Sequence, residues 1–310
     1  MKQLILSFGE VLWDVFPDGA RLGGAPFNFA YRAQSLGAES RLISRIGQDE
    51  DGDRILARME SLAMSREGIQ RDPHRPTGLV DIRVDETGNP DFSIRPNAAY
   101  DVIEWQPEFE TWAQTARAIC FGTVAQRTPH SRATLQTLLS HLQEAYRVLD
   151  LNLRKDCYDE TIVGESLSHA DVLKINLDEA RWLAKHGGSG TDSVQETANW
   201  LLKAWDLSVV LITLGGRGLY CRSIEEEAYA AGYKVQVRDT TGSGDACTAA
   251  FVSALVRGAS LKDCAHRGNG LGAMVAMQPG ATEPVSDRAL SEFLDAEHQR
   301  VIEPEFRDLA

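Results

Sequence analysis

The chain has 310 residues, and 43% of them are hydrophobic, which suffices for a sizeable core in one large α/β domain or two smaller ones. The 32 basic and 45 acidic residues give a net charge of -13 without a prominent basic stretch, so no nucleic-acid partner is expected. The sequence shows neither a signal peptide nor a run of about eighteen apolar residues, which predicts a cytoplasmic protein with no membrane partner.

Apolar strands alternate with amphipathic helices along the chain. The expected strands cover residues 4–8, 40–46, 118–121, 148–152, 172–176 and 209–213. The expected helices cover residues 26–36, 51–63, 129–145, 177–185, 194–205 and 246–255. This alternation predicts an α/β fold with a mostly parallel sheet and helices on both faces. Ligands bind beyond the carboxyl ends of such strands, where Asn152, Asn176 and Thr213 are expected to converge.

One stretch breaks the alternation and predicts a hairpin. Val80, Ile82 and Val84 alternate with polar residues, and residues 86–89 supply a turn before a second strand over 91–95. A lone hairpin is only marginally stable in water, so it must pack against another part of the molecule. Together with residues 11–16 it is expected to form a small sheet over the crevice, although a plain surface hairpin is the alternative.

A glycine-rich segment leads into the first expected helix. Pro26 suits the first position of that helix. Gly23 and Gly24 allow the backbone to approach a ligand closely, and Asn28 offers both a donor and an acceptor, as a polyol requires. The alternative is an ordinary loop-to-helix junction with a solvated Asn28.

A second glycine-rich segment, residues 239–245, reads Asp-Thr-Thr-Gly-Ser-Gly-Asp and runs into an apolar helix. Free backbone N–H groups at such a helix start can hold a phosphate or a developing negative charge. Asp245, in the first helical turn, could accept a proton from a hydroxyl beside that phosphate. The segment therefore predicts phosphoryl transfer to an alcohol, with an ordinary helix cap as the alternative.

The sequence lacks the motifs of several other common functional sites. The five cysteines are widely spaced and lack a CxxC pair, which fits reduced buried thiols better than a disulfide framework or a zinc site. The seven histidines form no HExxH pattern, and neither a Walker A sequence nor a GxGxxG after a strand is present. Metalloprotease, P-loop ATPase and ordinary dinucleotide-dependent dehydrogenase are therefore disfavoured.

The two glycine-rich segments together resemble the PfkB, or ribokinase-like, family of sugar kinases. Residues 23–37 resemble its N-terminal signature and residues 239–251 its C-terminal signature. Shorter family elements are matched by residues 47–52, 150–154, 176–179 and 213–218, so the resemblance covers nearly the whole chain. It implies a ribokinase-like three-layer sandwich formed by residues 1–310 as one domain, with a small β-sheet lid made by segments at about 10–22 and 78–98.

The same resemblance implies roles for particular residues. Asp245 would be the catalytic base, and the anion hole would consist of the backbone N–H groups of Gly242, Ser243 and Gly244. The further sugar or phosphate ligands would be Asp14, Gly24, Asn28, Arg95 and Arg154. Either arginine could instead form a surface ion pair, because its guanidinium suits both kinds of partner.

Nucleotide and metal contacts are also implied by the resemblance. The expected ATP contacts are Asn152, Lys174, Thr213, Gly215, Gly216, Gly218 and Asn269. Asn176 and Glu179 would place Mg²⁺ through water, with a strand end followed by a helix-start carboxylate as the alternative. A monovalent cation such as K⁺ would lie near residues 239–241 and 280–282.

The resemblance is greatest to bacterial fructokinases, which implies transfer of the γ-phosphoryl group of ATP to fructose, giving fructose 6-phosphate. The runner-up is 2-keto-3-deoxygluconate kinase, although Ser93 and Ile94 stand where those kinases usually carry tyrosines. Ribokinase or a nucleoside kinase follows, and a sugar-binding regulator without catalysis is the alternative from another class. The apolar face of the hairpin further predicts a homodimer joined through the lid.

Overall fold

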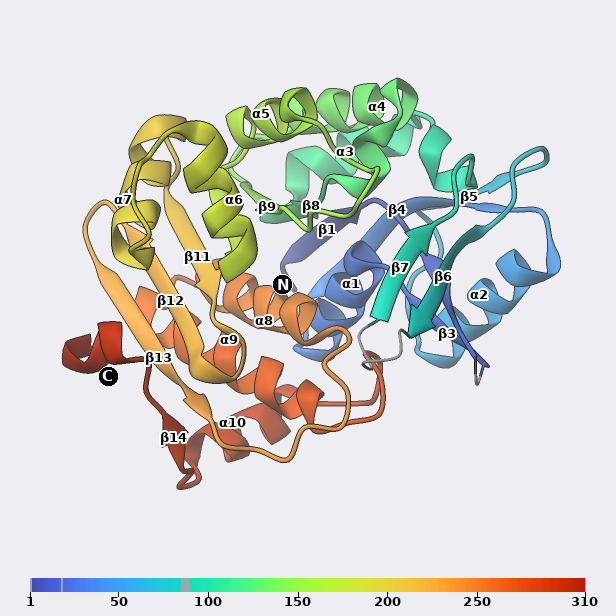
Figure 1. Ribbon diagram of the computed structural model, residues 1–310. Coiled ribbons are helices and arrows are strands. Elements are labelled where there is room, and N and C mark those ends of the chain that lie inside the picture. Colours follow the sequence, from blue (N-terminus) through green and yellow to red (C-terminus); the bar gives the residue numbers. More distant parts are fainter. Residues whose placement is uncertain (1, 18, 85–89, 310) are drawn as a thin grey trace.

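The structure, a computed structural model, describes residues 2–17, 19–84 and 90–309. Its core is built on both faces of one large sheet (Figure 1). In the first strand, Leu4, Leu6 and Phe8 pack into one apolar cluster, whereas Ile5 packs into a second cluster. Because side chains alternate between the faces of a strand, one apolar run supplies both clusters and creates three layers.

Within the described residues the large sheet has ten strands in the order β14-β13-β12-β11-β10-β9-β8-β1-β4-β5. The strands from β5 to β11 in this order run parallel, and β11 to β14 pair antiparallel. Their bounds are β1 (Leu4–Phe8), β4 (Glu39–Gly47), β5 (Ile69–Asp72), β8 (Ala118–Phe121), β9 (Tyr146–Asp150), β10 (Val172–Asn176), β11 (Val209–Thr213), β12 (Gly218–Ser223), β13 (Glu227–Tyr233) and β14 (Arg300–Val301).

Two groups of helices cover the sheet. One face carries α1 (Ala25–Ser35), α2 (Glu50–Ser61), α8 (Ser243–Leu255), α9 (Leu261–Ala276) and α10 (Asp287–Asp295). The other face carries α3 (Pro107–Thr115), α4 (Pro129–Ser140), α5 (Glu160–Ser168), α6 (Leu177–Gly187) and α7 (Val194–Trp205). Short 3₁₀ helices are η1 (Ala99–Val102), η2 (Val124–Arg127), η3 (Gly215–Arg217) and η4 (Pro304–Leu309). The expected three-layer α/β fold is confirmed.

A separate small sheet stands beside the large one, at the right of Figure 1. Its strand order is β3 (Gly19–Gly23), β2 (Leu12–Phe16), β6 (Gly78–Val84) and β7 (Pro90–Ile94). The predicted hairpin is confirmed, because β6 and β7 pair antiparallel with Val80 opposite Ile94. The predicted turn at residues 86–89 lies outside the described residues. β3 overlaps the predicted lid segment at about 10–22, but it was not predicted as a separate strand.

The apolar face of the hairpin is already buried by this chain. Val80 and Ile82 are each 4% exposed and belong to the same core cluster as Leu12 and Tyr100. These two side chains therefore offer no free surface for a second copy, which corrects the reasoning behind the expected lid dimer; the side chain of Val84 is not described. The homodimer stays a prediction, and sedimentation at micromolar concentration tests it.

Other sequence expectations differ from the structure in detail. The helix expected over residues 129–145 ends at Ser140, where the ring of His141 bonds the carbonyl of Thr137 and the chain turns toward β9. All five cysteines are free and buried, as predicted. No helix in the described part of the chain has the length and apolar character needed to cross a membrane.

Candidate active site

The start of α8 is an uncapped helix end. Gly242 precedes it with φ 75°, and no side chain caps the helix N–H groups. A Cβ added at Gly242 would lie 2.4 Å from the Cβ of Ala281, so this turn requires glycine both for its left-handed backbone and for its close packing. The buried hydroxyl oxygen of Ser243 has no hydrogen-bond partner in the described residues. The N–H of Ser243, predicted as an anion-hole donor, already donates to the carbonyl of Thr240 at 3.1 Å. The N–H groups of Gly242 and Gly244 remain, and donors at the positive end of a helix dipole form a site for an anion.

Asp245, the third residue of α8, is held by a residue from the other end of the chain. The side-chain amide of Asn28 in α1 donates to Asp245 Oδ2 at 2.8 Å. Burial raises the pKa of Asp245 to about 6; Asp150 adds to this rise, and Lys174 and Asn28 oppose it. Asn28 Oδ1 is buried without a partner in the described residues. A hydroxyl of a bound ligand could donate to it, since a buried acceptor left unpaired is costly.

A buried ion pair lies beneath the start of α8. Lys174 Nζ in β10 donates to Asp150 Oδ1 in β9 at 2.8 Å, and the two side chains are only 9% and 7% exposed. A Cβ added at Gly244 would lie 3.2 Å from Lys174 Nζ, so the ammonium group is close to the helix start. Burial alone would lower the pKa of Lys174, but Asp150 and Glu179 outweigh it and hold that pKa above its usual value. The ammonium therefore adds a fixed positive charge to the anion site.

A cavity of about 330 Å³ opens between this centre and the small sheet. Asp245 and Asn28 line it from the helices, and Asp14 lines it from β2. Burial raises the pKa of Asp14 to about 6, against the opposing charge of Arg154. Arg154 also lines the cavity, with its guanidinium carbon 5.4 Å from the ring centroid of Phe92 in β7. A cavity with converging polar groups under an apolar cover suits a small polyol.

Glu10, just beyond the carboxyl end of β1, is a further residue of this cavity. Its side chain is buried, and burial raises its pKa to about 8. Glu10 is therefore protonated at neutral pH and can donate a hydrogen bond as an uncharged acid. Glu10 was not among the ligands predicted from the sequence. Its position after a central parallel strand is the signal that could have identified it.

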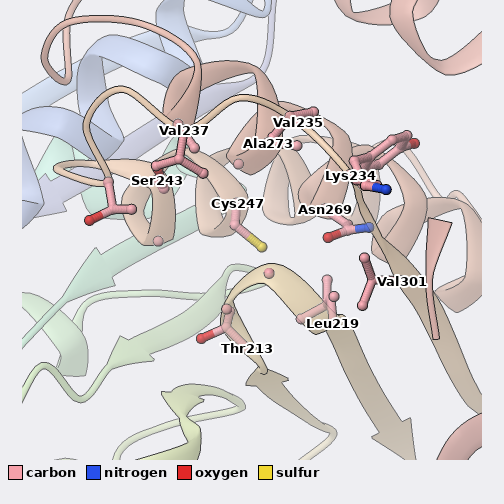
Figure 2. Close-up of a pocket in the computed structure, with 18 residues that line it drawn as sticks. Thr213, Leu219, Lys234, Val235, Val237, Ser243, Cys247, Asn269, Ala273 and Val301 are labelled. Atoms are coloured by element: carbon pink, nitrogen blue, oxygen red, sulfur yellow. The ribbon is translucent and has the colours of Figure 1, made fainter. Parts of the chain in front are cut away.

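A second cavity, of about 410 Å³, lies on the other side of the start of α8. Figure 2 shows Leu219 and Val301 on one side and Val237 and Ser243 on the other, with Cys247 between them. Most of the side chains labelled in Figure 2 are apolar, which suits a flat aromatic base. Gly215, Gly216 and Gly218 line it as expected, at the turn between β11 and β12. The apolar wall after β13 was missed because it carries no polar motif.

The two cavities meet at the start of α8. Both are lined by Thr213, Thr240 and Gly244. Ser243 faces the apolar cavity, whereas Gly242 and Asp245 line the polar one. A group bound by the N–H groups of this turn can therefore pass from a ligand in one cavity to a ligand in the other.

Comparison with known proteins decides the family. The family model described as "pfkB family carbohydrate kinase" matches residues 5–288. The chain belongs to this family. It is therefore a phosphotransferase that acts on a sugar hydroxyl.

Individual relatives agree with this assignment. Fructokinase-1 of Oryza sativa subsp. japonica is 26% identical over 309 residues, which cover 90% of this chain and 94% of that protein. Fructokinase-1 of Zea mays is 27% identical over 292 residues, covering 84% and 86% of the two chains.

Solved structures show the same fold. A fructokinase from Xylella fastidiosa with bound ATP superposes with a TM-score of 0.81 at 21% identity, covering 95% of this chain and 98% of that chain. A fructokinase from Vibrio cholerae O395 bound to fructose, ADP and calcium gives 0.80 at 24% identity, covering 94% and 99%.

The structure of this family member corrects several expected contacts. Arg95 is not among the residues lining either cavity; its side chain is 54% exposed and forms an ion pair with Asp81 on the hairpin. Asn152 and Lys174, expected at ATP, line the polar cavity, with Lys174 beside the start of α8 where the two cavities meet. Asn269 does line the apolar cavity, but its amide donates to the carbonyl of Ala231 at 2.9 Å and so braces β13.

The two residues expected at Mg²⁺ form a cap in this kinase. Asn176 Oδ1 accepts from the backbone N–H groups of Asp178 and Glu179, and Glu179 accepts in turn from those of Leu153 and Asn176. Both side chains nevertheless line the polar cavity. Within the described ranges, no three His, Cys, Asp or Glu side chains are grouped to hold a metal ion. Such a donor set fits a hydrated Mg²⁺ held through its waters better than a direct protein cage.

Proposed function

We propose that this kinase transfers the γ-phosphoryl group of ATP to the primary hydroxyl of fructose, giving fructose 6-phosphate and ADP. The observation that carries the proposal is the junction of two cavities at the start of α8, with Asp245 on the polar side. The apolar cavity has the character expected for the nucleotide. The polar cavity has the size and hydrogen-bonding groups of a sugar site. The sequence similarity to fructokinases supports fructose as the acceptor.

The roles of the residues follow from their positions. Asp245 accepts the proton of the acceptor hydroxyl while that oxygen bonds to the γ-phosphorus and the bond to the departing ADP oxygen breaks. The N–H groups of Gly242 and Gly244 and the Lys174 ammonium stabilise the charge on the transferring group. Asn28 orients Asp245 through its hydrogen bond. Mg²⁺, placed through water by Asn176 and Glu179, would neutralise charge on the phosphates when it is bound.

Arg154 favours a second candidate, 2-keto-3-deoxygluconate. Its guanidinium lines the sugar cavity and could pair with the carboxylate of an acid sugar in a bidentate manner. A neutral ketohexose would instead accept hydrogen bonds from Arg154 at its hydroxyls. We rank fructose first because the relatives reported above are fructokinases.

A coupled ADP-release assay over fructose, 2-keto-3-deoxygluconate, ribose and nucleosides tests the proposal. Fructose should give the highest kcat/KM. A higher value for the acid sugar would establish the second candidate, and a higher value for ribose or a nucleoside would contradict both. Sugar binding by calorimetry with no turnover of any sugar would identify a regulator instead of an enzyme.

Replacing Asp14 by Ala should raise the KM of the sugar and leave the KM of ATP nearly unchanged. Asp14 lines only the polar cavity, and losing a charged hydrogen-bond acceptor typically costs about 1.5 to 3 kcal/mol, or about 10-fold to 150-fold in affinity. Steady-state kinetics with each substrate varied in turn measures both constants. Equal increases in both KM values would show a damaged lid and contradict a direct role in sugar binding.

The pH dependence of kcat/KM should show an acid limb near pH 6. Burial raises the pKa of Asp245 to about 6, so the base is protonated and unable to accept a proton below that pH. The rate should fall about tenfold per pH unit on the acid side and level off between about pH 6 and about pH 8, where Glu10 ionises. An Asp14→Asn variant removes a second carboxyl with a pKa of about 6 and should keep this limb. A kcat/KM that stays unchanged down to pH 5 would contradict the role of Asp245.

We further place the reaction in the cytoplasm, where ATP is available and cysteines remain reduced. All five cysteines of the described structure are free thiols, which supports this placement. Mg²⁺ is the expected partner of ATP in this reaction. Omitting Mg²⁺ from the assay should abolish turnover.

A further inference from the structure

A buried arginine stands behind the anion site. Arg32, in α1, is the largest fully buried side chain among the residues whose burial the structure describes, with none of its surface exposed. Its guanidinium donates to the carbonyl oxygens of Ala281 and Glu283, with Nη1 2.7 Å from the latter. A buried charge is costly unless its environment compensates for it. Such a charge on an otherwise ordinary helix therefore calls for an explanation.

The loop held by Arg32 packs directly against the turn that binds the phosphoryl group. A Cβ added at Gly242 would lie 2.4 Å from Ala281, so any shift of this loop moves the turn. Arg32 also lies one helical turn after Asn28, the residue that holds Asp245, and such residues share a helix face. One face of α1 therefore fixes both the catalytic carboxylate and the loop behind the anion site.

The charge of Arg32 persists at neutral pH. Burial lowers its pKa to about 10, and Tyr31, Glu283 and Asp245 oppose this change. The guanidinium therefore carries a positive charge close enough to Asp245 for the two groups to interact. It contributes to the potential that surrounds the transferring group.

The residues present do not favour K⁺ at this loop. The carbonyl groups of Ala281 and Glu283 already accept from a charged donor. In the other segment expected at this cation, residues 239–241, Asp239 Oδ1 accepts from the N–H of Thr241 at 2.9 Å. A metal ion placed against the same carbonyl groups would meet the repulsion of the guanidinium at short range.

We propose that Arg32 is a positioning residue that supplies, from within the chain, the cation for the loop at residues 281–283, so that phosphoryl transfer does not depend on a monovalent metal ion. The inference rests on phosphoryl transfer at the start of α8 and adds how the anion site is kept in place. Arg32 lines neither cavity; it acts through Ala281 on Gly242.

The first test uses the unmodified protein and its best sugar. Turnover is measured with choline as the monovalent cation and again with K⁺ at equal ionic strength, using the Tris salt of ATP. The two values of kcat should agree within about twofold, because the loop already has its cation. A stimulation by K⁺ of about tenfold or more would overturn the proposal.

The second test removes the charge. Arg32→Ala should lower kcat by about tenfold or more, since a small displacement of a catalytic group has effects of this order. The KM of the sugar should change little, and millimolar guanidinium should restore part of kcat. Arg32→Lys keeps the charge and should fall between the parent and Arg32→Ala. A folded Arg32→Ala variant with the parent's kcat would overturn the proposal.

Arg58 provides a matched control. Its exposed guanidinium donates to the hydroxyl of Ser61 and, within the same loop, to the hydroxyl of Thr282 at 3.3 Å, but to no carbonyl oxygen of the loop in the described residues. Arg58→Ala should keep the kcat of the parent and its indifference to K⁺. A loss of kcat as large as that of Arg32→Ala would show that any arginine contact to the loop matters, and would overturn the specific role of Arg32.

Thermal unfolding of the unmodified protein gives a readout that needs no turnover. A ligand that binds only the native state raises the unfolding temperature with its concentration. Replacing choline by K⁺ should leave this temperature unchanged. A K⁺-dependent rise would reveal a bound ion and overturn the proposal. This result remains interpretable when no tested sugar is phosphorylated, which separates it from a failure of the proposed function.

Discussion

Replacing Asp245 by Asn should lower kcat by about 100-fold or more while leaving ATP and sugar binding nearly intact. The substitution keeps the shape and the contact to Asn28 but removes the group that accepts the proton. Steady-state kinetics gives kcat, and calorimetry with each ligand gives the two affinities. A variant that turns over within a few-fold of the parent would exclude Asp245 as the base.

Asp263 is a matched control for this substitution. It occupies the third position of α9, just as Asp245 does in α8, and it is an acidic residue in the first turn. Asp263 is exposed and bonds only the cap residue Ser260. Asp263→Asn should therefore keep the kcat of the parent. A comparable loss in both variants would indicate a general effect of helix-start charge.

Replacing Lys174 by Met should destabilise the native state by about 3 to 5 kcal/mol, because it leaves the buried carboxylate of Asp150 without its partner. It should also lower kcat, since the ammonium is close to the anion site. Urea unfolding followed by circular dichroism measures the free energy of unfolding. An unfolding midpoint equal to that of the parent would contradict the buried pair.

A double variant separates the two effects of Lys174. Asp150→Asn combined with Lys174→Met removes both charges, so most of the lost stability should return. The kcat should stay low, because no ammonium is restored near Gly244. Recovery of kcat together with stability would show that Lys174 only supports the fold.

The sequence predicts the central parallel strands correctly because both of their faces are buried. Strands such as β1 and β11 are therefore unbroken apolar runs bounded by polar residues. The start of α8 can also be predicted from the sequence, because a turn with a left-handed glycine before a helix needs a specific local sequence. By contrast, β13 contains four Ala or Gly residues among seven, which have low strand propensity, and its pairing with β12 was missed.

Individual contacts in the site were harder to predict, because they depend on which wall of a cavity a strand end reaches. Asn152 and Lys174 follow from the sequence as strand residues, yet only the assembled sheet turns them toward the sugar cavity. The register of the hairpin could have shown that Arg95 is not a ligand in the site. Asp81 pairs opposite Ser93, which places Arg95 diagonally across from it, within reach of an ion pair.

The hydrogen bond from Asn28 to Asp245 joins residues 217 positions apart in the chain. During synthesis, β1 and α1 emerge long before α8. Asn28 therefore cannot bond Asp245 until α8 has been translated. A chain released before residue 255 can contain most of the large sheet and the whole small sheet, yet it lacks a complete α8. Activity therefore requires translation through α8, and a message interrupted before that helix cannot give a partly active kinase.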